Sequence, residues 1–116
     1  MSDDDLLDRY MRSRATGDFA ALRAVLADDL HFQDPLDTYD TADAFVASMT
    51  RLLSGPVRAI VAQRAVRRDG HAAIFSTWDT AVGSADFAEH LTITGGRVSR
   101  IQAYFDPRPF ARGAGD

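Results

Sequence analysis

The second half of the chain contains four consecutive β-strand segments divided by turns too short for anything but hairpins. These segments are rich in valine, isoleucine, threonine and aromatic residues, and they cover 57–68, 71–82, 85–94 and 97–106. The breaks between them are Arg68-Asp69-Gly70, Val82-Gly83-Ser84 and Thr94-Gly95-Gly96. Strands joined by such short turns run in opposite directions. The sequence therefore predicts a mainly antiparallel sheet.

The first half of the chain predicts helices with one apolar face each. Acidic residues followed by apolar residues at helical spacing indicate a helix near 3–15, and Gly17 ends it. Asp18 can cap a second helix that reaches about residue 27. A third helix is predicted over 41–53, with Asp40 or Thr41 as its cap.

Between the second and third helices, the alternation of Leu30, Phe32 and Asp34 with polar residues predicts a short strand that Pro35 stops. A polar loop is expected over 35–40. Three helices and a meander of long strands give an α+β domain in which the helices cover a strongly curved sheet and enclose a cone-shaped pocket. We expect one domain over 1–116, with its core at about 3–106 and a loose tail at 107–116.

Composition excludes several classes of function. The 116 residues contain no cysteine, and all 13 basic residues are arginine, so disulfides, thiolate chemistry and a Schiff-base lysine are excluded. A net charge of -4 has the wrong sign for a general nucleic-acid binder. No apolar run exceeds four residues, so we expect a cytoplasmic protein with no membrane contact. The three histidines lack metal-binding spacing, and we expect neither a metal nor a cofactor.

Strand alternation predicts which side chains face the pocket. Two carboxylic acids interrupt otherwise apolar faces: Glu89, the single glutamate, and Asp34. The remaining inward positions suit a flat, hydrophobic, carbonyl-bearing ligand. The expected ligand-binding residues are Phe32, Ser76, Trp78, Phe87, Leu91, Ile101, Ala103 and Phe105.

Two buried acids suit acid–base chemistry near neutral pH. Burial disfavours the charged form of an acid, and a second acid nearby disfavours it further. A proton acceptor must be ionised, whereas a partner that donates a hydrogen bond to a developing oxyanion must stay protonated.

The chain resembles the NTF2-like superfamily, within it the SnoaL-like and ketosteroid-isomerase-like group, over about 3–106. The residues that carry the resemblance are Arg9-Tyr10, Gly17-Asp18, Leu26-Ala27-Asp28-Asp29, Asp34-Pro35, Gly96-Arg97-Val98 and Ile101-Gln102-Ala103-Tyr104-Phe105. The resemblance implies that Asp34 is a proton shuttle and that Tyr10 is an oxyanion donor. It also implies that Glu89 stands where the isomerases carry a protonated aspartic acid, which in those enzymes donates a hydrogen bond to the oxyanion beside the tyrosine. The outer face of the sheet carries Tyr104 and Gln102 beside His90 and Thr92, a mixed surface that suits a partner sheet, so we expect a homodimer, which the resemblance supports.

Several alternatives stay open at this stage. Asp34 before proline is also typical of a loop cap, and Tyr10 of a core aromatic whose hydroxyl bonds to the backbone. The alternative for Glu89 is a partly exposed glutamate at the wide mouth of the sheet, paired with an arginine. An arginine relay between two acids needs an inward-facing arginine, which the pattern does not single out. The functional hypotheses are therefore an isomerase or cyclase acting on a small hydrophobic carbonyl compound, and a non-catalytic ligand-binding or dimerisation domain.

Overall fold

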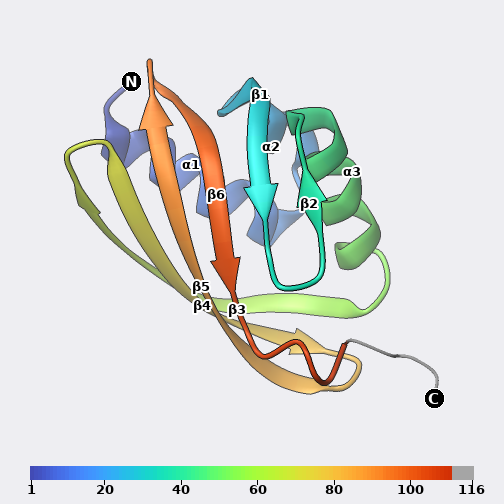
Figure 1. Ribbon diagram of the computed structural model, residues 1–116. Coiled ribbons are helices and arrows are strands. Elements are labelled where there is room, and N and C mark those ends of the chain that lie inside the picture. Colours follow the sequence, from blue (N-terminus) through green and yellow to red (C-terminus); the bar gives the residue numbers. More distant parts are fainter. Residues whose placement is uncertain (111–116) are drawn as a thin grey trace.

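The computed structural model describes residues 1–110 and contains a six-stranded sheet. The strand order is β2-β1-β6-β5-β4-β3, and only the pairing of β1 with β6 is parallel (Figure 1). The strands are β1 (Leu26–Gln33), β2 (Thr38–Tyr39), β3 (Val57–Arg68), β4 (His71–Thr80), β5 (Gly83–Thr94) and β6 (Arg97–Tyr104). The prediction of a mainly antiparallel sheet is confirmed.

Residues with a left-handed backbone form two of the tight turns. Asp69 and Gly70 have φ values of 47° and 79°, and Gly95 and Gly96 have values of 59° and 76°. Two successive positive φ angles match the right-handed twist of the flanking strands, which lets the chain reverse within two residues. These turns fix the register of the meander.

Three helices lie on the same face of the sheet (Figure 1). They are α1 (Asp3–Thr16), α2 (Phe19–Ala24) and α3 (Ala42–Leu53). Side chains of Ser2, Asp18 and Thr41 accept hydrogen bonds from backbone amides of the first turns, so each helix has a polar cap. Among residues 1–110, no helix has the length and apolar content that crossing a membrane requires.

Several predicted boundaries differ by one or two residues, such as β4, which ends at Thr80 rather than at 82, β5, which begins at Gly83 rather than at 85, and β6, which ends at Tyr104 rather than at 106. Two differences are larger. The second helix ends at Ala24 rather than near residue 27, and β1 begins at Leu26, because Leu26 pairs with Val98 of β6. The loop predicted over 35–40 contains β2, in which Tyr39 pairs with Phe32. Both differences arise from pairings with another strand, which local propensity does not report.

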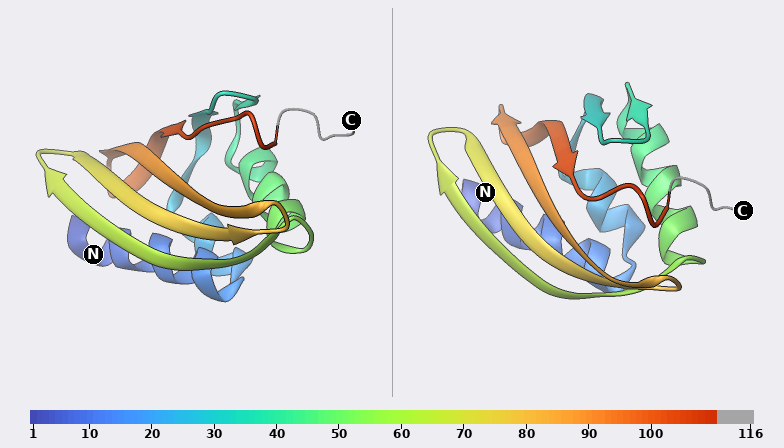
Figure 2. Two further views of the ribbon diagram at one scale, coloured as in Figure 1. Left: turned by 90° about the horizontal axis from the view of Figure 1, so that it is seen from below. Right: turned by 60° about the horizontal axis from the view of Figure 1, so that its bottom comes forward.

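The sheet bends strongly along β3, β4 and β5 (Figure 2). The β3–β4 pairing shifts register twice, between Val57 and Ala59 and between Ile60 and Ala62. Such bulges increase local twist and bend the strand. The bend turns one face of the sheet toward the helices.

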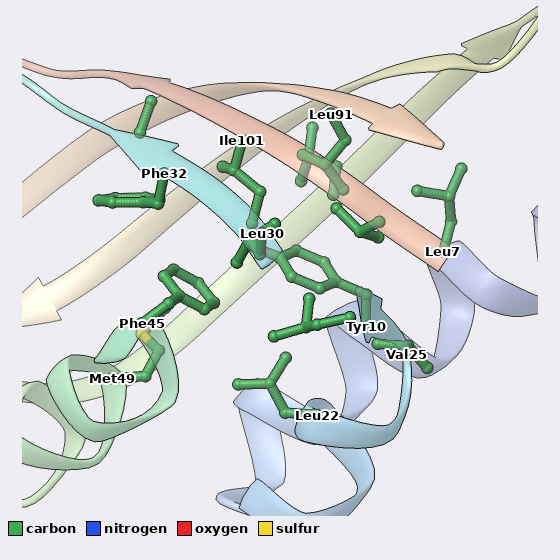
Figure 3. Packing of buried hydrophobic residues seen from close by; sticks show 14 of the residues in the cluster. Leu7, Tyr10, Leu22, Val25, Leu30, Phe32, Phe45, Met49, Leu91 and Ile101 are labelled. Carbon is green, nitrogen blue, oxygen red and sulfur yellow. The ribbon is translucent and has the colours of Figure 1, made fainter. Parts of the chain in front are cut away.

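The core lies between the helices and this inner face of the sheet. Leu22 and Val25 from the helical side pack with Tyr10, Leu30 and other apolar residues (Figure 3). The inward-facing sets predicted for β4 and β5 are buried or half-buried, whereas their neighbours alternate toward solvent. The strand alternation in the sequence is thus confirmed, and the fold is the expected α+β cone.

Candidate functional site

A cavity of about 140 Å³ opens at the end of the cone formed by α3, the β1–β2 turn and the inner faces of β4, β5 and β6. Its lining is mainly apolar and aromatic, with Asp34, Asp37, Ser48, Thr80 and Glu89 as polar members. The apolar and aromatic members are Phe32, Leu36, Phe45, Met49, Leu52, Pro56, Val57, Trp78, Phe87, Ala103, Phe105 and Phe110.

Five of the residues expected to bind a ligand line this cavity, namely Phe32, Trp78, Phe87, Ala103 and Phe105. Leu91 and Ile101 are fully buried in the core instead. Ser76 is also buried, and its Oγ accepts a hydrogen bond of 2.9 Å from Nε1 of Trp78. Ser76 therefore acts on the cavity by fixing the indole ring that lines it.

Aromatic rings gather at the mouth of the cavity. Phe87 stacks on Trp78 with ring centroids 4.3 Å apart and lies 4.6 Å from Phe105. Phe110 meets Phe105 edge-on at 5.7 Å. The part of the tail that the structure describes thus brings Phe110 over the cavity, while residues 111–116 of the expected loose tail lie outside the described residues.

Asp34 lies directly after β1, at the start of the turn into β2. Its Oδ1 accepts hydrogen bonds from the backbone amides of Leu36, at 2.8 Å, and Asp37, at 2.7 Å. Both of its side-chain hydrogen bonds within residues 1–110 use Oδ1, so Oδ2 faces its surroundings without a protein donor there. Asp34 is thus a loop cap and a cavity-lining carboxylate at once.

Desolvation raises the pKa of Asp34 above its ordinary value, and the negative charge of Asp37 adds to the increase. The two backbone amides oppose this by stabilising the carboxylate, but they do not cancel it. A carboxylate that is more basic than usual is better suited to accept a proton than an ordinary aspartate, as a general base must.

Glu89 lies on β5 at the cavity wall, and only 5% of its surface is exposed. Its Oε2 accepts hydrogen bonds from the hydroxyl of Tyr10, at 2.9 Å, and from Nη1 of Arg14, at 2.8 Å. Nη2 of Arg14 lies 2.6 Å from Oε1 of Glu89, so the guanidinium meets both carboxylate oxygens. Tyr10, Arg14 and Glu89 form a buried polar cluster, called the α1–β5 cluster below.

Tyr10 is fully buried, and it is absent from the lining of the cavity. Its hydroxyl donates to Glu89 and accepts a hydrogen bond of 3.2 Å from Nη1 of Arg14. Burial, with the charge of Glu89, raises the pKa of Tyr10 well above its ordinary value, although Arg14 opposes this. The hydroxyl proton of Tyr10 is therefore held inside the protein.

Arg14 is the member of the cluster that sequence reasoning missed. Burial alone lowers its pKa, but the neighbouring Glu89 and Tyr10 outweigh burial and raise it, so the side chain is charged. Its Nε donates to Oε1 of Gln63 at 2.8 Å, and its guanidinium carbon lies 4.7 Å from the ring centroid of Tyr10. The signal was spacing, because Arg14 follows Tyr10 by four residues and shares its helix face.

The cluster changes the interpretation of Glu89. Every contact described above brings a hydrogen-bond donor to its carboxylate, and one of these donors is the guanidinium of Arg14. The sequence-based expectation was a neutral acid that donates a hydrogen bond into the pocket. These contacts agree with one part of the alternative, the pairing with an arginine, whereas the burial of Glu89 differs from the partly exposed position that the alternative assumed.

The histidines lie away from the cavity. His31 contacts Asp40 at 2.9 Å on the surface, and His71 contacts His90 at 3.0 Å on the outer face of the sheet. Among residues 1–110, no group of three or more potential metal ligands comes together.

The topology and the cone-shaped site define an NTF2-like fold. A solved NTF2-like protein of unknown function from Cytophaga hutchinsonii has a TM-score of 0.83 and 15% identity, covering 97% of this chain and 96% of that one. A protein from Kribbella flavida is 28% identical with a TM-score of 0.79, covering 92% and 88% of the two chains. Another from Kribbella flavida, described as a candidate ketosteroid isomerase, has a TM-score of 0.78 and 15% identity, with coverage of 88% and 76%.

The family model of the SnoaL-like domain matches residues 7–101. The chain therefore belongs to the SnoaL-like family. No curated protein matches it.

Proposed function

We propose that the protein is a cofactor-independent acid–base enzyme of the ketosteroid-isomerase or polyketide-cyclase type, acting on a small hydrophobic carbonyl compound. One observation carries the proposal. Asp34 combines a raised pKa, an Oδ1 fixed by two backbone amides and an Oδ2 that no donor within residues 1–110 contacts, at an aromatic cavity. This combination gives a carboxylate that is oriented by the backbone yet keeps an oxygen for a ligand.

The proposed reaction moves one proton. The Asp34 carboxylate removes the proton from the carbon next to the carbonyl group, and the C–H electron pair forms the carbon–carbon double bond of an enolate. In the isomerase reaction, the neutral aspartic acid then returns the proton to the same or a conjugated carbon. In the cyclase reaction, the enolate carbon bonds to a second carbonyl carbon, the π electrons of that carbonyl move to its oxygen, and the aspartic acid gives its proton to the alkoxide that forms. Asp34 ends either cycle as a carboxylate, so no oxidant or reductant is needed.

The lining supports a flat apolar substrate. Stacked Trp78 and Phe87 present ring surface, and Phe45 and Met49 of α3 supply apolar contacts opposite the strands. Burial of a hydrophobic ring against these groups contributes roughly 25 cal/mol for each Å² removed from water.

Tyr10 and Glu89 take a supporting role in this proposal. Direct contact of Tyr10 with a substrate oxygen requires its bond to Glu89 to break and the lining to open, which costs part of a buried network. We therefore assign the α1–β5 cluster to holding α1 against β5 and keeping the cavity wall in place.

The test is hydrogen–deuterium exchange next to the carbonyl of cyclic ketones and enones in D₂O, followed by NMR. The wild type should accelerate exchange, and Asp34→Asn should lose about 100-fold or more, since the amide cannot accept the proton. Asp37→Asn is the matched control, because Asp37 is a neighbouring lining carboxylate in the same turn. Equal exchange by wild type and Asp34→Asn, or equal losses in both variants, contradicts the role of Asp34.

A second candidate function is a non-catalytic ligand-binding or dimerisation domain. It is favoured by the internal pairing of the α1–β5 cluster, because Tyr10 and Glu89 then bond to each other and to Arg14 rather than to a ligand. If ketones bind in the cavity but the protein does not accelerate their hydrogen–deuterium exchange, the result supports this alternative.

We also propose a homodimer formed through the outer face of the sheet. Phe75 and Tyr104 are 53% and 56% exposed there, and Gln102, His90 and Thr92 lie on the same face. Two such faces bury these rings against each other. Light scattering at micromolar concentration should give the mass of two chains, and the mass of one chain contradicts the proposal.

A further inference from the structure

Proton removal by Asp34 leaves negative charge on the substrate oxygen, and the cavity must offer a hydrogen-bond donor to it. The polar residues that line the cavity include three carboxylates, Asp34, Asp37 and Glu89, which accept rather than donate when ionised. Tyr10 does not line the cavity, and its proton is engaged with Glu89. The donor must therefore come from another lining residue.

Three side chains of the lining carry a neutral donor: Trp78, Thr80 and Ser48. Nε1 of Trp78 donates to Ser76. The hydroxyl of Thr80 donates to the carbonyl oxygen of Gly83 at 2.6 Å and accepts from the amide of Val82. The protons of Trp78 and Thr80 are thus already donated to protein acceptors, and Ser48 is the remaining candidate for a donor to the substrate oxygen.

The hydroxyl of Ser48 differs from the other hydroxyls near it along α3. Thr50 donates to the carbonyl oxygen of Val46 at 2.8 Å, and Ser54 donates to that of Thr50 at 2.6 Å. The contact of Ser48 within residues 1–110 is with the hydroxyl of Tyr39, at an O–O distance of 3.1 Å. When Tyr39 donates to Ser48 Oγ, the proton of Ser48 is free to reach a ligand.

Two contacts with Phe32 fix the position of Tyr39. It lies on β2, pairs with Phe32 across the β1–β2 hairpin and stacks on that ring with centroids 5.7 Å apart. The same turn carries Asp34, so the base and the support for Ser48 are set by one hairpin, while α3 supplies Ser48 itself. The hairpin and α3 thus bring the base, Asp34, and the candidate hydrogen-bond donor, Ser48, to the same cavity.

We infer that Ser48 donates the hydrogen bond that holds the substrate's carbonyl oxygen, with Tyr39 as a positioning residue that donates to Ser48 Oγ. This inference rests on the proposed function for its catalytic meaning, whereas the binding contact stands apart from it. Chains of hydroxyl groups polarise one another, so charge on the substrate oxygen strengthens the bond from Tyr39 to Ser48.

The test measures the hydrogen bond to the carbonyl oxygen of a bound ketone through its ¹³C chemical shift, so it does not require turnover. 2-Cyclohexenone and 1-indanone labelled with ¹³C at the carbonyl are bound to the wild type, Ser48→Ala, Tyr39→Phe and Thr50→Val. The carbonyl resonance should move downfield in the wild type, return toward its value in an apolar solvent in Ser48→Ala, and return part of the way in Tyr39→Phe. Thr50→Val removes a hydroxyl from the same helix outside the cavity lining and should leave the resonance unchanged.

The kinetic arm uses the exchange reaction. Ser48→Ala should lower kcat by about 100- to 1000-fold with a small change in KM, as expected for a donor used mainly in the transition state. A wild type that shifts the carbonyl but catalyses no exchange removes the proposed function and keeps the Ser48 contact. An unchanged resonance in Ser48→Ala, or no binding of either probe to the wild type, overturns the inference.

Discussion

The two acidic sites of the cone differ in how completely the protein satisfies them. Glu89 is buried, its Oε2 accepts hydrogen bonds from a hydroxyl and a guanidinium, and the same guanidinium lies 2.6 Å from its Oε1. Asp34 is fixed through one oxygen by two backbone amides, and desolvation raises its pKa. The comparison assigns different roles to the two acids. A buried carboxylate with partners on both oxygens, such as Glu89, stabilises the fold, whereas one that keeps an oxygen free of donors within residues 1–110, such as Asp34, can still accept a proton from a ligand.

The largest expected effect comes from breaking the α1–β5 cluster. Glu89→Gln leaves the buried guanidinium of Arg14 without a countercharge and should lower the free energy of unfolding by about 3 kcal/mol. Denaturant unfolding measures this.

The control for that prediction is the double variant Arg14→Met with Glu89→Gln, which removes both charges. It should recover a large part of the loss, since replacing a buried pair as a whole is far less costly than removing one partner. A Glu89→Gln variant as stable as the wild type at neutral pH contradicts the ion pair and restores a neutral Glu89.

The second effect concerns the loop cap. Asp34→Ala removes the acceptor for the amides of Leu36 and Asp37 and should cost about 1 kcal/mol of unfolding free energy. Asp34→Asn keeps an oxygen for these amides and should cost less than Asp34→Ala. Equal losses in the two variants would show that the charge of Asp34, rather than its geometry, holds the turn.

The third effect concerns the mouth of the cavity. Phe110→Ala removes a ring that meets Phe105 edge-on and lines the cavity, while leaving the α1–β5 cluster intact. Affinity for an aromatic ketone should fall by about 3- to 10-fold, because an aromatic pair contributes about 0.5–1.5 kcal/mol. Calorimetric titration measures this, and an unchanged affinity places the ligand away from the mouth.

The sequence predicted the strands and their inward-facing residues well, because alternation along β4 and β5 is a local pattern. It placed Glu89 in line with Phe87 and Leu91, and the structure shows that placement. It also expected Leu91 and Ile101 to contact a ligand, but both are buried in the core and absent from the cavity lining. Alternation identifies the inner face of a strand, but it does not show which part of that face the helices cover.

Arg14 shows where local patterns fail. Arginine is nearly always exposed, and the chain has 13 basic residues, so one arginine on an apolar helix face does not stand out. Its role depends on Glu89, which lies 75 positions further along the chain. Ser48 was missed for the same reason, since its contact with Tyr39 joins α3 to a two-residue strand that was predicted as loop.

The smallest expected effect is the pH dependence of stability at Asp34. Desolvation raises its folded pKa above the ordinary value of 3.8, so the native state favours the neutral acid more than the unfolded chain does. Its contribution to stability is therefore fully present below pH 3.8 and is lost as pH rises through the folded pKa. Asp34→Asn cannot ionise, so the variant should gain stability relative to the wild type as pH rises from 3.8 through the raised value, and the difference should then level off. Urea unfolding of both proteins across this window measures the difference, and Asp37→Asn serves as the control for a general change in charge. A difference that instead moves in favour of the wild type means that the backbone amides outweigh desolvation, and Asp34 then resembles Glu89 as an acid held for structure.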